Sequence, residues 1–154
     1  MKKKIGYLLF YFPIRNMTYI LNEVTDLIDL EQDVELLSFD KPPHATPHKD
    51  FSRYRLGEKV RYKPLERRPD GTPLTTRDLI AMAGKSFFGR GNMSFSQKVN
   101  LLRACYDRQV GKSLSLARFY ACMEAIRFIR ELDIDVLYIH LGNNASYFLP
   151  ITQV

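Results

Sequence analysis

Short apolar runs alternate along this chain with segments whose apolar residues recur at helical spacing. Residues 4–10 form a continuous apolar run of strand length, which is typical of a strand buried on both faces of a parallel sheet. Helical spacing follows through residues 18–28, and residues 34–39 are predicted as the next strand after a short connection. This order predicts a strand, a helix and a strand, the unit from which parallel sheets are built.

The middle of the chain has a different pattern. Residues 41–74 are rich in proline and charge, so we expect a long surface segment in which only residues 59–62 resemble a strand. Apolar residues then return at helical spacing behind serines and threonines that can cap helices. The three predicted helices start at Thr75 or Thr76, run from Ser94 or Ser96 to about Gln109, and run from Ser113 to Leu132.

The C-terminal part predicts one more strand and the start of another helix. Residues 135–141 are apolar and closed by Gly142, and residues 143–149 begin a helical pattern. A helix directly after a buried strand normally leads to a further strand. We therefore expect an α/β fold with a Rossmann-like parallel sheet flanked by helices, in which residues 1–154 form a single, incomplete domain.

Composition and cysteine content are those of a globular protein from a reducing compartment. The hydrophobic fraction is 45% and the charged fraction 26%, which argues against disorder. The basic N-terminus and its apolar run stop at Pro13 without a cleavage site, so we interpret them as the first strand of a cytoplasmic protein. Cys105 and Cys122 lie in helical patterns and are expected to be buried thiols.

The charge pattern indicates an anionic partner. The net charge is +6, and basic residues concentrate in residues 53–68. This stretch is either a solvated loop or, together with Phe87 and Phe88, a contact to an anionic membrane surface. Its mixture of aromatic and basic residues also resembles single-strand nucleic-acid binders, but it occupies one loop and matches no known nucleic-acid-binding signature. Nucleic acid is therefore disfavoured.

No motif assigns a catalytic residue, a metal or a cofactor. Two Gly-Lys-Ser triplets lack the earlier glycine of a phosphate-binding loop, because Leu79 and Tyr106 occupy that position. His44 and His48 are four residues apart but have no cysteine or paired carboxylates nearby. The catalytic residues stay unassigned, and no metal ion or cofactor is predicted.

The carboxyl ends of the first and last predicted strands are where ligands bind in open parallel sheets. Residues 6–23, GYLLFYFPIRNMTYILNE, resemble the opening FPxxSETFIxxE of family-four-type GT-B glycosyltransferases that make exopolysaccharide or lipopolysaccharide. Residues 135–142, DVLYIHLG, resemble the strand of that family that ends HxHFx. The matched positions are Phe12, Pro13, Thr18, Tyr19 in place of phenylalanine, Ile20, Glu23 and His140; Asn16 and Met17 replace Ser-Glu, and Tyr138 replaces the first histidine.

The resemblance implies the N-terminal, acceptor-side part of a GT-B enzyme. In this family the nucleotide-sugar donor binds a C-terminal domain, which is missing from this chain, so the chain alone is expected to be catalytically incomplete. The implied reaction moves a hexose to a glycan or lipid-linked acceptor without a metal, in the cytoplasm at the inner face of the membrane. The implied acceptor-binding residues are Asn16, Thr18, Tyr19, His140, Gly142 and Asn143.

Two alternatives remain open at this point. Thr18 is also explained as a helix cap, and His140 as a core histidine bonded to backbone. The competing functional class is a standalone binding module for an anionic partner, either a membrane surface or single-stranded nucleic acid. A donor domain encoded after Val154 would distinguish the glycosyltransferase from the binding module.

Overall fold

The computed structural model describes residues 2–13, 18–40, 48–65, 72–89, 93–106, 111–140, 148, 150 and 151, with the backbone alone for residues 111–114 and 140. The chain divides into two compact units. The first comprises Met1–Pro64 with Leu132–Leu141, and the second comprises Leu65–Glu131 with Gly142–Val154.

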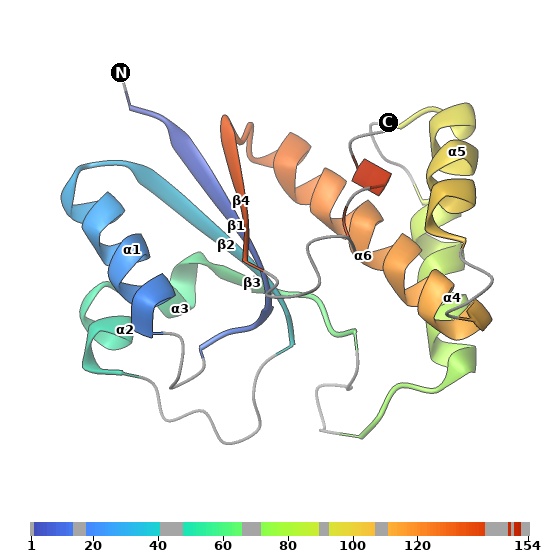
Figure 1. The fold of residues 1–154 in the computed structure, drawn as a ribbon, viewed down its shortest axis with the longest axis horizontal. Coiled ribbons are helices and arrows are strands. Elements are labelled where there is room, and N and C mark those ends of the chain that lie inside the picture. The colour runs from blue at the N-terminus through green and yellow to red at the C-terminus, as the bar shows by residue number, and fades with distance from the viewer. Residues whose placement is uncertain are drawn as a thin grey trace. The chain divides into compact units, whose positions relative to one another are not determined.

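In the described residues, the first unit is built on a four-stranded, all-parallel sheet in the order β3-β2-β1-β4. Strand β1 (Lys4–Tyr11) lies between β2 (Asp33–Asp40) and β4 (Val136–His140), and β3 (Val60–Tyr62) pairs with the other side of β2 (Figure 1). The predicted α/β class, the parallel sheet and the interior position of the first strand are confirmed. An interior strand has to be apolar on both faces, which is the pattern of residues 4–10.

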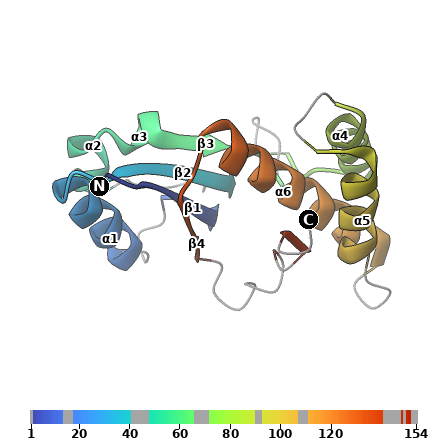
Figure 2. The same cartoon turned by 90° about the horizontal axis from the view of Figure 1, so that it is seen from above.

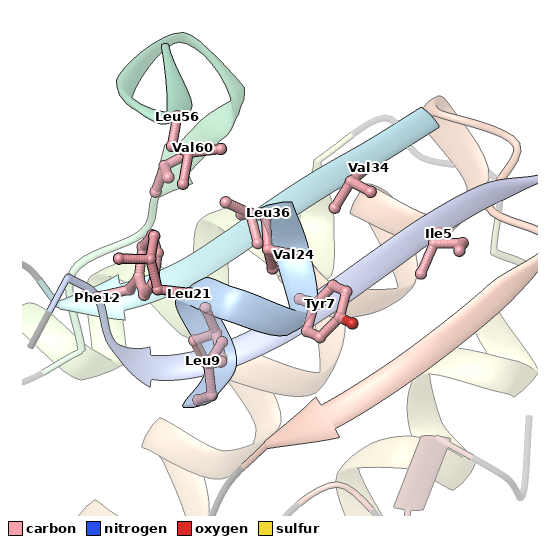
Figure 3. Packing of buried hydrophobic residues seen from close by; sticks show 11 residues of the cluster. Ile5, Tyr7, Leu9, Phe12, Leu21, Val24, Val34, Leu36, Leu56 and Val60 are labelled. Carbon is pink, nitrogen blue, oxygen red and sulfur yellow. The ribbon is translucent and has the colours of Figure 1, made fainter. Parts of the chain in front are cut away.

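One face of the sheet is covered by helix α1 (Thr18–Asp29). Alternate β1 residues point to this face, and in the parallel register Ile5 pairs with Val34 and Tyr7 with Leu36 (Figure 3). Burial of each aliphatic side chain here stabilises the fold by about 1.5–3 kcal/mol. The α1 residues buried in this core are Ile20, Leu21 and Val24.

The segment predicted as a surface excursion contains two short helices, α2 (Lys49–Arg53) and α3 (Leu56–Lys59). Leu56 is fully buried and belongs to the same core as α1 and the sheet. The surface prediction is therefore wrong for Leu56, whereas α2 contains no buried residue. Helices this short have no periodicity that a sequence pattern can reveal, and they are stable only through tertiary packing.

The second unit contains the helices α4 (Thr76–Phe88), α5 (Phe95–Cys105) and α6 (Gly111–Glu131). Thr75 caps α4 in a capping box with Asp78, and Ser94 caps α5 in a capping box with Gln97. Both predicted helix starts are confirmed. The predicted end of α5 near Gln109 is too late, because the helix ends at Cys105.

Helices α4 and α5 both pack against α6 (Figure 2). On α6, apolar residues that recur at helical spacing are buried at Ala117, Ala121, Ala125 and Phe128. The ammonium group of Lys98 donates to the carbonyl oxygens at the end of α4, at 2.8 Å from Phe87 O and 3.0 Å from Gly89 O. These bonds satisfy carbonyls that have no partner within the helix.

The two cysteines belong to this helical unit. Cys105 lies on α5 and Cys122 on α6, and both are free thiols that are fully buried. Their side chains are hydrogen-bonded to each other. The prediction of buried thiols is confirmed.

In the described part of the chain, no helix has the length and apolarity needed to cross a membrane. The same residues contain no group of three or more histidine, cysteine, aspartate or glutamate side chains placed to hold a metal ion.

Candidate functional site

The strand order locates the ligand-binding edge that this type of sheet uses. Going along the chain, the order proceeds from β1 outward to β2 and β3 and then returns to β4 on the other side of β1. Ligands of open α/β sheets bind outside the carboxyl ends of the strands at such a point of reversal. In the register of this sheet Leu9 of β1 pairs with His140, the last residue of β4. The carboxyl ends of β1 and β4 therefore lie next to each other.

Three of the six predicted acceptor-binding residues lie within the described chain. Thr18 is the first residue of α1 and is exposed, and Tyr19, which follows it, is 58% exposed. His140 ends β4. Thr18 and His140 thus belong to elements that adjoin the same edge of the sheet, while their joint contact with an acceptor stays a prediction. The other predicted residues, Asn16, Gly142 and Asn143, lie outside the described residues.

Hydrogen bonds tie the carboxyl ends of β1, β2 and β3 together. The backbone N–H of Phe12 donates to the Asp40 carbonyl at 3.4 Å, and the Tyr62 hydroxyl donates to the Phe12 carbonyl at 3.1 Å. The backbone N–H of Lys63 donates to the Ser38 carbonyl at 2.9 Å. Burial raises the pKa of Tyr62, so its hydroxyl stays a donor at neutral pH. These hydrogen bonds therefore fix the backbone at Phe12, directly after β1.

Sequence reasoning missed a contact group behind this edge, formed by Tyr7 of β1, Glu23 of α1 and Tyr138 of β4. The rings of Tyr7 and Tyr138 stack at 5.2 Å with an interplanar angle of 13°. Burial, and next the carboxylate of Glu23, raise the pKa of the Tyr7 hydroxyl. The motif match at Glu23 was the sequence signal available, but only the register, which pairs Tyr7 with Tyr138, reveals the contact. The group joins the three elements that lead to the candidate site.

The raised pKa of Tyr7 predicts a change in alkaline stability when Tyr7 is replaced by phenylalanine. An unfolded tyrosine loses its proton near pH ~10, whereas folded Tyr7 keeps it, so the unfolded state binds fewer protons above that pH. The free energy of unfolding then falls by up to about 1.4 kcal/mol per pH unit as pH rises. Tyr7→Phe is expected to remove this contribution, measured by urea denaturation between about pH 9 and about pH 11.

A second variant provides the comparison. Tyr120 of α6 is buried and its pKa is also raised, first by burial and then by Glu124. Tyr120→Phe is therefore expected, like Tyr7→Phe, to make the free energy of unfolding fall less steeply with rising pH in the alkaline range. An unchanged slope in Tyr7→Phe would contradict the protonated state of this hydroxyl in the fold.

The basic stretch is partly engaged in contacts within the first unit. The Arg53 guanidinium lies 5.4 Å from the centre of the Tyr54 ring, and the Tyr54 hydroxyl donates to Asp29 at 2.7 Å. The Lys59 ammonium is 3.8 Å from the Asp33 carboxylate and 3.4 Å from the Val34 carbonyl. These cations are less available to a partner than the sequence indicates. Arg67 and Arg68 lie outside the described residues.

A cavity of about 580 Å³ lies at the amino-terminal edge of the sheet. It is lined by residues at the start of the strands, including Lys2, Gln32 and Asp33, together with Lys59. Ligands of parallel sheets bind at the opposite edge. This cavity is therefore not the predicted acceptor site.

Part of the chain is similar to proteins described as glycosyltransferases of exopolysaccharide biosynthesis. The colanic acid biosynthesis glycosyltransferase WcaL of Escherichia coli K12 is 32% identical over 68 residues, which are 44% of this chain and 16% of that protein. WcaL of Salmonella typhimurium LT2 is 31% identical over 68 residues, with the same coverage of both chains. The amylovoran biosynthesis glycosyltransferase AmsK of Erwinia amylovora is 34% identical over 59 residues, 38% of this chain and 14% of AmsK.

The similarity covers only a short part of each relative. The matched stretch spans no more than 16% of any of these relatives. No protein-family model matches the sequence, and no solved structure matches the chain. What the comparisons show is that part of this chain is similar to proteins described as glycosyltransferases of exopolysaccharide biosynthesis.

Proposed function

We propose that this chain is the N-terminal, acceptor-side part of a GT-B glycosyltransferase of the family-four type. The parent protein transfers a hexose from a nucleotide sugar to a glycan or lipid-linked acceptor during synthesis of a cell-surface polysaccharide. The observation that carries the proposal is the similarity to exopolysaccharide glycosyltransferases over 44% of the chain. The parallel sheet supports it, because its order 3-2-1-4 is that of the first four strands of a Rossmann-like sheet.

In the proposed arrangement the acceptor binds at the carboxyl edge of β1 and β4. Side chains of Asn16, Thr18 and His140 supply hydrogen-bonding groups for sugar hydroxyls, and Gly142 and Asn143 add backbone and amide groups. The exposed ring of Tyr19 offers a flat apolar surface to a pyranose. The nucleotide sugar binds a domain outside these residues, so the isolated chain binds no donor and transfers no sugar.

The experiment uses the full protein that contains this chain, assayed for hexose transfer from UDP- and GDP-sugars to lipid-linked acceptors. Thr18→Ala and Tyr19→Ala are expected to raise KM for the acceptor about tenfold, the effect of losing about 1.4 kcal/mol of binding. KM for the nucleotide sugar is expected to stay unchanged, because the donor contacts other residues.

Leu30→Ala is the matched control, because Leu30 is 68% exposed in the turn after α1 and is not one of the proposed acceptor residues. It is expected to leave both KM values unchanged. The proposal fails if the full protein transfers no hexose from any nucleotide sugar. The site assignment alone fails if transfer occurs and the two variants match Leu30→Ala.

A further inference from the structure

Helices α4 and α5 carry apolar residues on the side that α6 leaves open. Their contacts with the unit's core use other positions, among them Leu79 and Ala83 of α4 and Leu101 and Cys105 of α5. Large exposed apolar residues mark sites of interaction when they gather on one surface. The exposed fractions are 56% for Ile80, 84% for Phe88, 70% for Phe95, 38% for Leu102 and 53% for Tyr106.

The spacing of these residues gives each helix a second, outward apolar stripe. On α4 the positions Ile80, Gly84 and Phe88 recur every four residues, and a Cβ added at Gly84 would have no atom within 4 Å. On α5, Phe95 and Leu102 are separated by seven residues, which places them on one helical face, and Tyr106 directly follows the last helical residue, Cys105. Each helix therefore exposes large apolar side chains at recurring positions, Ile80 and Phe88 on α4 and Phe95 and Leu102 on α5.

An aromatic cluster joins the end of α4 to the start of α5. The Phe87 ring lies 5.1 Å from Phe88 and 5.5 Å from Phe95, both in edge-to-face geometry. It also lies 6.1 Å from Phe119, which is buried on α6. Phe87 thereby connects the two exposed rings to the helical core. These ring contacts hold Phe88 and Phe95 close together on the surface.

Positive charge accompanies the exposed apolar residues. Arg77 and Lys85 of α4 and Arg103 of α5 are exposed. Helix α5 contains no acidic residue, and the acidic residue of α4, Asp78, is bonded within the capping box of Thr75. Helices with apolar and aromatic residues beside basic ones, and without acidic ones, are typical of the membrane interface.

A groove between α5 and α6 adds a place for an apolar chain next to a cation. It has a volume of about 450 Å³ and is lined by Leu102, Tyr106 and Leu116, together with Ser115 and Arg103. A lipid has this combination of an apolar chain and an anionic head group.

We propose that the outward surface of α4 and α5 binds anionic phospholipids at a membrane surface. Phe88 and Phe95 enter the interface, and Arg103 contacts head groups at the mouth of the groove. None of its residues belongs to the proposed acceptor site. Lipid binding by this surface does not depend on glycosyl transfer by the protein. It also differs from the basic stretch of residues 53–68, which lies largely in the first unit.

The test is co-sedimentation of the protein with vesicles of phosphatidylcholine alone and of phosphatidylcholine mixed with phosphatidylglycerol, at low and high salt. Binding to the mixed vesicles at low salt, weakened by salt, is expected. The double variant Phe88→Ser with Phe95→Ser is expected to lower partitioning at least ~10-fold, because two rings no longer leave water. Arg103→Gln is expected to lower it about fivefold, the effect of one cation near an anionic surface.

Two variants on the first unit are matched controls. Leu30→Ser removes an exposed apolar side chain, and Arg53→Gln removes a cation from the basic stretch. Both are expected to bind vesicles as the unchanged protein does, and far-UV circular dichroism checks that every variant is folded. The proposal is overturned by absence of binding to the mixed vesicles, by equal binding to pure phosphatidylcholine, or by controls that lose as much binding as the α4 and α5 variants.

Discussion

Replacement of Phe12 by alanine is expected to lower the free energy of unfolding by about 3–5 kcal/mol. Phe12 is 1% exposed, and its ring packs on Phe51 at 5.8 Å between ring centres. Its backbone also accepts a hydrogen bond from Tyr62 and donates one to Asp40. Removal of the ring leaves a cavity where β1 turns toward α1. Urea denaturation followed by far-UV circular dichroism measures the effect.

Phe88→Ala is the control for this prediction, because the same side chain is removed from a position that is 84% exposed. Its expected effect is within about 0.5 kcal/mol. Phe12→Leu keeps most of the apolar volume and is expected to cost about 1.5 kcal/mol or less, which gives a measurable variant if Phe12→Ala does not fold. Equal stabilities of Phe12→Ala and Phe88→Ala would refute the assignment of Phe12 to the core.

Arg127→Met is expected to destabilise the helical unit by about 3 kcal/mol. The guanidinium of Arg127 lies 2.8 Å from a carboxylate oxygen of Glu124, whose side chain is only 3% exposed. Ser86 of α4 donates to the same oxygen at 3.3 Å. Methionine preserves the apolar stem of Arg127 but leaves the buried carboxylate without its cation. The change is measured as the shift in the free energy of unfolding at neutral pH.

A double-mutant cycle separates the charge pair from other effects. Glu124→Gln combined with Arg127→Met removes both charges and is expected to be markedly more stable than Arg127→Met alone, because no uncompensated charge remains buried. Arg77→Met, at an exposed position near the start of α4, is expected to change stability by about 0.5 kcal/mol or less. Additive effects of the two single changes would show that the pair is not energetically coupled.

The sequence was sufficient to predict that the candidate site lies at the ends of two strands, but not which contacts form there. Apolar runs located the strands, and the parallel arrangement placed the end of residues 4–10 and the end of residues 135–141 at one edge. Leu9 and His140 are indeed register partners. Contacts across that edge, such as the bond from Tyr62 to Phe12, depend on pairing between β1, β2 and β3 and have no local sequence signal. The acceptor contacts themselves stay predictions.

The sequence by itself determined the elements whose signal is local. A continuous apolar run of strand length specifies an interior strand, which is why β1 was predictable. The starts of α4 and α5 follow from Thr75 and Ser94, since a capping side chain bonds to backbone three residues later. These interactions involve neighbouring residues, so they are encoded wherever the pattern occurs.

Only the tertiary structure decided which distant residues meet. Helices α2 and α3 have five and four residues, and they contact the sheet core through the partly buried Phe51 of α2 and the buried Leu56 of α3. The stacking of Tyr7 on Tyr138 and the link from Phe87 to Phe119 likewise join positions far apart in the sequence. Such contacts become favourable only after the chain has closed the intervening loops, because the entropy cost of closure is met by burial in the folded core.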